Sequence, residues 1–126
     1  MSILSQTRGP KPRALIVEDD PFLLLDMEDM LGAAGVHVTG LAVTKTAALN
    51  LIQRKDFDIA TIDYDLAGET SEEVAALLEK KDIPFILVSS MTDVLKNKPI
   101  FKNRPALEKP VSEKVLTKTI HNLTLA

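Results

Sequence analysis

Four charged residues follow short apolar runs in this sequence. Glu18 and Asp19 follow one such run, Asp63 follows a second, and Lys109 follows a third, shorter run. A carboxylate at the end of a buried strand costs free energy unless another group compensates its charge. Three carboxylates and one lysine in such positions predict a site that binds a metal ion and a phosphoryl group.

The elements that would position these residues alternate between strands and helices. Apolar runs typical of buried strands are predicted at 13–18, 36–43, 57–63, 84–89 and 104–108. Helical patterns separate these runs, although the stretch 91–104 is so poor in helical periodicity that its helix should be short or disordered. Strands that alternate with helices indicate an α/β fold with a parallel, doubly wound sheet. Ligands bind at the carboxyl ends of the strands in such sheets, where Asp19, Asp63, Ser89 and Lys109 are expected.

Local signals predict where the helices begin and which faces they bury. Pro21 fits the first turn of one helix, and Thr44 and Ser112 fit the position that caps two others. Thr70 and Glu73 have the spacing of a capping box, and residues 66–70 before them are predicted to form a loop. The buried faces of the first and last helices are predicted to contain, respectively, Leu23, Met27, Met30 and Ala34, and Val115, Leu116, Ile120 and Leu123.

Composition limits the class of protein. The 126 residues fit one domain, which we place at 13–126 after a flexible tail at 1–12. There is no cysteine, which excludes disulfides and thiolate metal sites, and the net charge of −3 argues against a nucleic-acid binder. The sequence has neither a signal peptide nor an apolar run of membrane-spanning length, so we expect a cytoplasmic protein without a membrane partner.

Several motifs make the chain resemble the receiver domain of two-component response regulators. The segment Val17-Glu18-Asp19-Asp20-Pro21 is similar to the acidic pair of that family, and Asp63 is similar to its phosphoacceptor. Ser89-Ser90 resembles the hydroxyl residue and small residue that end the fourth strand, and Lys109-Pro110 resembles the lysine and proline after the fifth. The resemblance covers residues 13–123, in the family's order.

The resemblance implies a flavodoxin-like fold with strand order 2-1-3-4-5 and a signalling role rather than an enzymatic one. Asp63 would accept a phosphoryl group from a sensor histidine kinase or a histidine phosphotransfer protein, with Lys109 and Ser89 contacting the phosphoryl oxygens. Mg²⁺ would be held by Glu18, Asp19, Asp63 and the backbone carbonyl of Asp65. The domain would then bind an unknown downstream protein or drain phosphate within a relay.

Two departures from the family pattern concern signal output. Ala106 stands where the family often has an aromatic residue, so the ring that usually transmits the signal is missing. We therefore expect the stretch 91–104, with its basic residues Lys96, Lys98, Lys102 and Arg104, to transmit the change. Two alternatives stay open: a degenerate receiver that only binds protein, and a haloacid-dehalogenase-like phosphatase suggested by the pair Asp63 and Asp65.

Overall fold

A computed structural model describes residues 10–95 and 97–125 and contains a five-stranded parallel sheet. Its strand order is β2-β1-β3-β6-β7, which confirms the predicted order 2-1-3-4-5. The strands are β1 (Arg13–Val17), β2 (His37–Ala42), β3 (Ile59–Asp63), β6 (Phe85–Ser89) and β7 (Ala106–Glu108). Phosphoacceptor candidate Asp63 therefore ends the central strand of the sheet.

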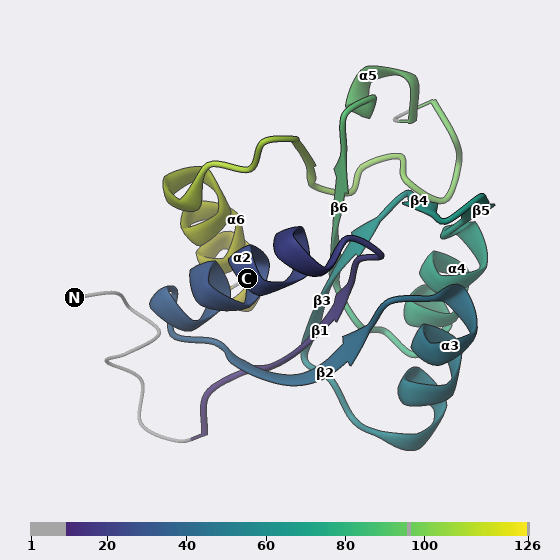
Figure 1. The fold of residues 1–126 in the computed structure, drawn as a ribbon. Helices are drawn as coiled ribbons and strands as arrows, with labels where there is room; N and C mark the ends of the chain where they lie inside the picture. Colours follow the sequence, from purple (N-terminus) through teal and green to yellow (C-terminus); the bar gives the residue numbers. More distant parts are fainter. Residues whose placement is uncertain (1–9, 96, 126) are drawn as a thin grey trace.

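Helices cover both faces of this sheet (Figure 1). Helices α2 (Pro21–Ala33) and α6 (Glu113–Leu125) lie on one face, and α3 (Lys45–Arg54) and α4 (Glu72–Lys80) lie on the other. Between β6 and β7 the described residues form only the four-residue helix α5 (Thr92–Leu95), so the prediction of a short helix there is confirmed. None of the helices within residues 10–95 and 97–125 has the length and hydropathy needed to cross a bilayer.

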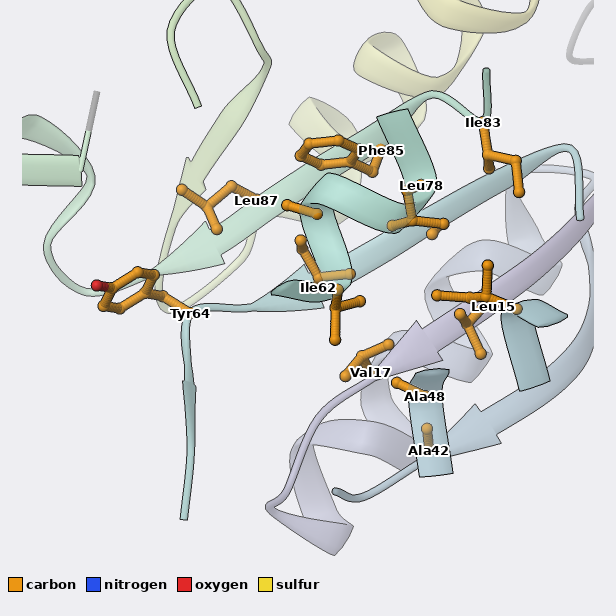
Figure 2. Packing of buried hydrophobic residues seen from close by; sticks show 14 of the residues in the cluster. Leu15, Val17, Ala42, Ala48, Ile62, Tyr64, Leu78, Ile83, Phe85 and Leu87 are labelled. Atoms are coloured by element: carbon orange, nitrogen blue, oxygen red, sulfur yellow. The ribbon is translucent and has the colours of Figure 1, made fainter. Parts of the chain in front are cut away.

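Two hydrophobic clusters, one on each face, hold the layers together. The cluster beneath α3 and α4 includes Leu15, Ile62, Leu78 and Phe85, which are labelled in Figure 2. The cluster beneath α2 and α6 includes Ala14, Ile16, Ile86 and Leu116. Neighbouring strand residues alternate between the two clusters because successive side chains of a strand point to opposite faces.

Helix α2 begins where Pro21 predicts, but one residue of its predicted buried face is exposed. Asp20 caps the helix by accepting hydrogen bonds from the backbone N–H groups of Phe22 and Leu23, and Pro21 occupies the first turn. The buried residues are Leu24, Met27, Leu31 and Ala34, whereas Leu23 is exposed and Met30 is half-buried. The prediction for Leu23 was wrong because residues 22–25 are all apolar, so periodicity does not select one face. Met30 packs against the cluster beneath α2 and α6, as predicted.

The segment after β3 differs most from the prediction. Residues 66–70 were expected to form a loop, but they belong to a small hairpin of β4 (Asp65–Leu66) and β5 (Glu69–Thr70). Its turn is formed by Ala67 and Gly68, which both have positive φ, at 52° and 90°. The predicted capping box was also wrong: Thr70 is part of β5, and α4 starts after Ser71 without a side-chain cap.

Two further predictions need correction near the C-terminus, the burial of Val115 and the start of the last strand. Ser112 caps α6 as predicted, because its Oγ accepts a hydrogen bond of 3.3 Å from the Val115 N–H. The predicted burial of Val115 was wrong, since Val115 is 49% exposed. Leu116 and Ile120 are buried, as predicted. Strand β7 begins at Ala106 rather than at residue 104, because Pro105 has no N–H and joins β6 only through its carbonyl, which accepts from Leu87.

The predicted tail at 1–12 lies mostly outside the described residues. Of its last three residues, which are described, Pro12 already contacts the sheet, because its carbonyl accepts a hydrogen bond from His37 N–H at 2.9 Å.

Candidate phosphoacceptor and metal site

The carboxyl ends of four neighbouring strands bring the predicted site residues to one edge of the sheet. Glu18 and Asp19 follow β1, Asp63 ends β3, Ser89 ends β6 and Lys109 follows β7. All these strands are parallel, so residues far apart in sequence meet where the strands end. Glu18, Asp63 and Ser89 are buried, and Asp19 and Lys109 are half-buried.

Lys109 joins two of the carboxylates directly. Its Nζ lies 3.0 Å from Asp63 Oδ2 and 3.1 Å from Glu18 Oε1. Charge-assisted contacts of this length fix the position of both partners. The sequence predicted that these three residues would share a site, but not that one ammonium group would bridge the two carboxylates.

Burial and neighbouring charge perturb the protonation of Glu18. Burial raises the pKa of its carboxyl group from 4.5 to about 7, and the charge of Asp63 acts in the same direction. A hydrogen bond from the Asp20 N–H, at 3.2 Å, and the contact with Lys109 oppose this rise in pKa but do not cancel it. Burial therefore makes the charged form of Glu18 costly, and the hydrogen bonds available to it offset only part of that cost.

The same contacts act on Lys109 in the opposite sense. Burial favours its neutral form, but hydrogen bonds and charge interactions with Asp63 and Glu18 outweigh burial and raise the pKa of the ammonium group above its ordinary value. Lys109 thus stays protonated at neutral pH and supplies a fixed positive charge beside Asp63.

The donor set fits a hard divalent cation. One carboxylate oxygen from each of Glu18, Asp19 and Asp63 lies within 4.8 Å of the others. Mg²⁺ prefers such oxygen ligands and keeps several of its waters, so a few carboxylates suffice. Asp65 lies on β4 with an exposed side chain, and the role of its backbone carbonyl as a further ligand remains a prediction.

Asp19 makes a contact that the sequence did not predict. Its Oδ2 accepts a hydrogen bond of 3.0 Å from the backbone N–H of Ala67, in the turn of the β4–β5 hairpin. Ala67 adopts a positive φ that a residue with a Cβ seldom takes, and this hydrogen bond helps to hold it there. Only Gly68 hinted at a tight turn in the sequence.

Ser89 lies at the same edge, and its hydroxyl takes part in one hydrogen bond within the chain. Ser89 Oγ accepts a hydrogen bond of 3.0 Å from Met91 N–H. A serine hydroxyl retains its own proton in this arrangement and can still donate to a group bound at the strand ends.

Comparison with known proteins agrees with this geometry. The chain is 29% identical over 80 residues to a protein-glutamate methylesterase/protein-glutamine glutaminase of Halobacterium salinarum, matching 63% of this chain and 23% of that protein. It is 30% identical over 79 residues to the phyllosphere-induced regulator PhyR of Methylorubrum extorquens, matching 60% of this chain and 30% of that protein. The match thus spans less than a third of each curated relative.

Solved structures share the fold. The receiver domain of PhyR from Erythrobacter litoralis superimposes with a TM-score of 0.81 at 24% identity, and the match covers 91% of both chains. Residues 14–121 match the response regulator receiver domain, which is most of the sequence. With the carboxylates and Lys109 at the strand ends of this fold, the chain belongs to the response regulator receiver domain family of two-component signalling.

Proposed function

We propose that this receiver is phosphorylated on Asp63 in a Mg²⁺-dependent reaction, with a sensor histidine kinase or histidine phosphotransfer protein as donor. The observation that carries the proposal is the bridge from Lys109 Nζ to Asp63 Oδ2 and Glu18 Oε1, at 3.0 and 3.1 Å, beside a third carboxylate. This arrangement places a nucleophile, a fixed cation and an oxygen-rich metal site within one small volume.

The chemistry follows from these positions. A carboxylate oxygen of Asp63 forms a bond to phosphorus while the bond from phosphorus to an imidazole nitrogen of the donor breaks. That nitrogen keeps the electron pair of the broken bond. A ring already protonated on its other nitrogen leaves as neutral imidazole, and an unprotonated ring takes up one proton to become so. Lys109 supplies a point charge to a phosphoryl oxygen, and Ser89 can donate a hydrogen bond to another. A cation bound by Glu18, Asp19 and Asp63 would reduce the repulsion between the carboxylate and the incoming phosphoryl group.

The phosphorylated domain would act by binding a downstream protein in the cytoplasm or by draining phosphate from a relay. Neither role requires turnover of a separate substrate, so we assign no enzymatic activity beyond the domain's own phosphorylation and dephosphorylation. Family membership also argues against the phosphatase alternative.

Incubation with a small acyl phosphate and Mg²⁺ tests the proposal. Intact-mass analysis should show one added phosphoryl group, labile to hydroxylamine, and chelation of the metal should abolish most of it. Asp63→Ala should remove the label, while Asp20→Ala should keep it because Asp20 caps α2 instead of facing the site. A wild-type protein that takes no label would identify a degenerate receiver, and equal labelling of Asp63→Ala would refute Asp63 as the acceptor.

A further inference from the structure

The segment between α5 and β7 is anchored in the core by one aromatic side chain. Residues 97–105 form successive turns rather than a helix, yet Phe101 in their middle is only 1% exposed. Phe101 belongs to the same hydrophobic cluster as Tyr64, Phe85 and Leu87, and the half-buried Ala106 packs against that cluster. Ala106 brings only a small side chain to this cluster, and Phe101 brings a large aromatic one from a different part of the sequence.

Phe101 contacts the residue that follows the phosphoacceptor. The rings of Tyr64 and Phe101 meet edge to face with centroids 5.8 Å apart, and Phe101 meets Phe85 in the same way at 6.5 Å. Figure 2 shows Tyr64 just beyond the end of its strand, at the margin of the cluster. A change in the position of Asp63 therefore reaches the Phe101 ring through a single peptide unit and one ring contact.

The outer side of residues 97–105 is held by weaker contacts. Lys98 lies 5.8 Å from the centre of the Tyr64 ring and 3.3 Å from a carboxylate oxygen of Glu72. Arg104 lies 4.6 Å from the centre of the Phe85 ring and 3.5 Å from Glu79. Ion pairs with this exposure contribute little to stability, so the burial of Phe101 is the main anchor.

The stretch before this segment also begins at the site. Ser89, which ends β6 beside Asp63, accepts the hydrogen bond from Met91 N–H that starts the turn into α5. If the Ser89 side chain changes rotamer to bring its hydroxyl to a phosphoryl oxygen, Oγ moves away from the Met91 N–H and this hydrogen bond is disturbed. The start of the stretch and its aromatic anchor thus both respond to the same strand ends.

We propose that Phe101 transmits the signal: phosphorylation of Asp63 displaces Tyr64, weakens its contact with Phe101 and loosens residues 97–105. This inference rests on the proposed phosphorylation. We expect loosening rather than tightening because the Phe101 ring is already fully enclosed, so a movement of Tyr64 can only make its packing worse. Phe101 thereby takes the part of the aromatic residue that Ala106 replaces, although it comes from the connecting segment and not from β7.

Amide hydrogen exchange over residues 97–105 tests this coupling in free and phosphorylated protein. Phosphorylation of wild type should speed exchange there by about tenfold, within the usual range of coupling between sites. In Phe101→Leu and Tyr64→Leu the ratio of the two rates should approach one, because the ring contact is missing in both states. Tyr64→Phe keeps the ring and should keep the wild-type ratio.

Phe57→Leu is the matched control for loss of a buried ring. Phe57 is 5% exposed and belongs to the same cluster, but it packs beside Gly40 of β2, away from residues 97–105. Its variant should therefore lose stability yet keep the ratio of exchange rates.

The possible outcomes separate this inference from the proposed function. A wild-type protein that shows no added phosphoryl group by mass overturns both. If phosphorylated wild type shows unchanged exchange over residues 97–105, only the role of Phe101 is overturned. The same holds if Phe101→Leu or Tyr64→Leu keeps the wild-type ratio of exchange rates, as Phe57→Leu should. If Phe101→Leu does not fold, the contrast between Tyr64→Leu and Tyr64→Phe decides the question.

Discussion

Replacing Glu18 by glutamine should change how the stability of the metal-free protein depends on pH. Glu18 is buried with 6% of its surface exposed, and its pKa is raised from 4.5 to about 7, chiefly because burial disfavours the charged form. Glutamine has nearly the same shape and can still accept hydrogen bonds from Lys109 and from the Asp20 N–H. It does not titrate, so the variant removes the proton equilibrium with little change in packing.

The size and sign follow from the difference in proton binding between the folded and unfolded chain. Between pH 4.5 and about 7 the folded protein holds the Glu18 proton while the unfolded chain has released it. The free energy of unfolding therefore falls as pH rises through this window, and the contribution of Glu18 is complete below it and lost above it. This rise in the pKa of Glu18 corresponds to a loss of unfolding free energy on the order of 3 kcal/mol as pH increases across the window.

Urea unfolding in the presence of a chelator, measured from pH 4 to pH 8, checks this value against the variant. Other carboxyl groups titrate in both proteins. The pKa of Asp58 is lowered by Arg13, so its contribution to stability rises with pH, opposite to that of Glu18. The quantity to compare is therefore the difference in unfolding free energy between wild type and Glu18→Gln at each pH. The variant should gain stability relative to wild type as pH rises. Parallel curves for the two proteins would show that burial of Glu18 imposes no cost on its charge.

Three further predictions concern the site and its supports. Gly40→Ala should destabilise the fold by about 1–3 kcal/mol in urea unfolding, because the new Cβ would lie 2.7 Å from a ring carbon of Phe57. Gly32→Ala in α2 is the control: its Cβ meets nothing within 4 Å, so the variant should be more stable than wild type by up to about 1 kcal/mol. Equal effects of the two substitutions would contradict the packing argument. Asp20→Ala should cost about 1 kcal/mol through loss of the α2 cap, and an unchanged midpoint would show that the cap contributes nothing. Asp19→Asn should keep the Ala67 amide protected from hydrogen exchange, because the amide oxygen can still accept its hydrogen bond, but should weaken Mg²⁺ binding measured by calorimetry. Asp19→Ala should lose both the protection of the Ala67 amide and the Mg²⁺ affinity. Protection that survives in the alanine variant would mean that Asp19 does not hold the turn.

The sequence could place the candidate site residues at one edge of the sheet because their positions depend on a simple rule. An apolar run followed by an acidic residue marks the end of a buried strand, and parallel strands bring their ends together whatever lies between them in sequence. Asp63, Glu18 and Lys109 could therefore be placed at one edge before any contact was known. The atoms that touch could not, because the reach of Lys109 to two carboxylates depends on side-chain geometry.

The errors occur where neighbouring residues offer equivalent local signals. Thr70 and Ser71 both suit a helix cap, and pairing of Thr70 with Asp65 in the β4–β5 hairpin decides in favour of Ser71 as the boundary. Val115 and Leu116 are adjacent apolar residues of which only Leu116 faces the sheet. The place of Phe101 was also out of reach, since nothing in a turn-rich stretch indicates that one ring enters the core.

The bridge formed by Lys109 has a consequence for how the protein is made. When all three carboxylates are ionised, its ammonium group offsets one of their charges, so the site without a metal has a formal charge of −2 instead of −3. The proton that Glu18 holds below about pH 7 reduces this charge further. In many small zinc domains metal binding and folding are one event, because the site does not exist in the unfolded chain and the metal supplies the free energy of folding. Here Lys109 acts as a counter-ion within the chain, so the protein would fold during synthesis without magnesium. A shortage of the metal would then leave folded receivers that cannot be phosphorylated. It would not produce unfolded chains for proteases to degrade.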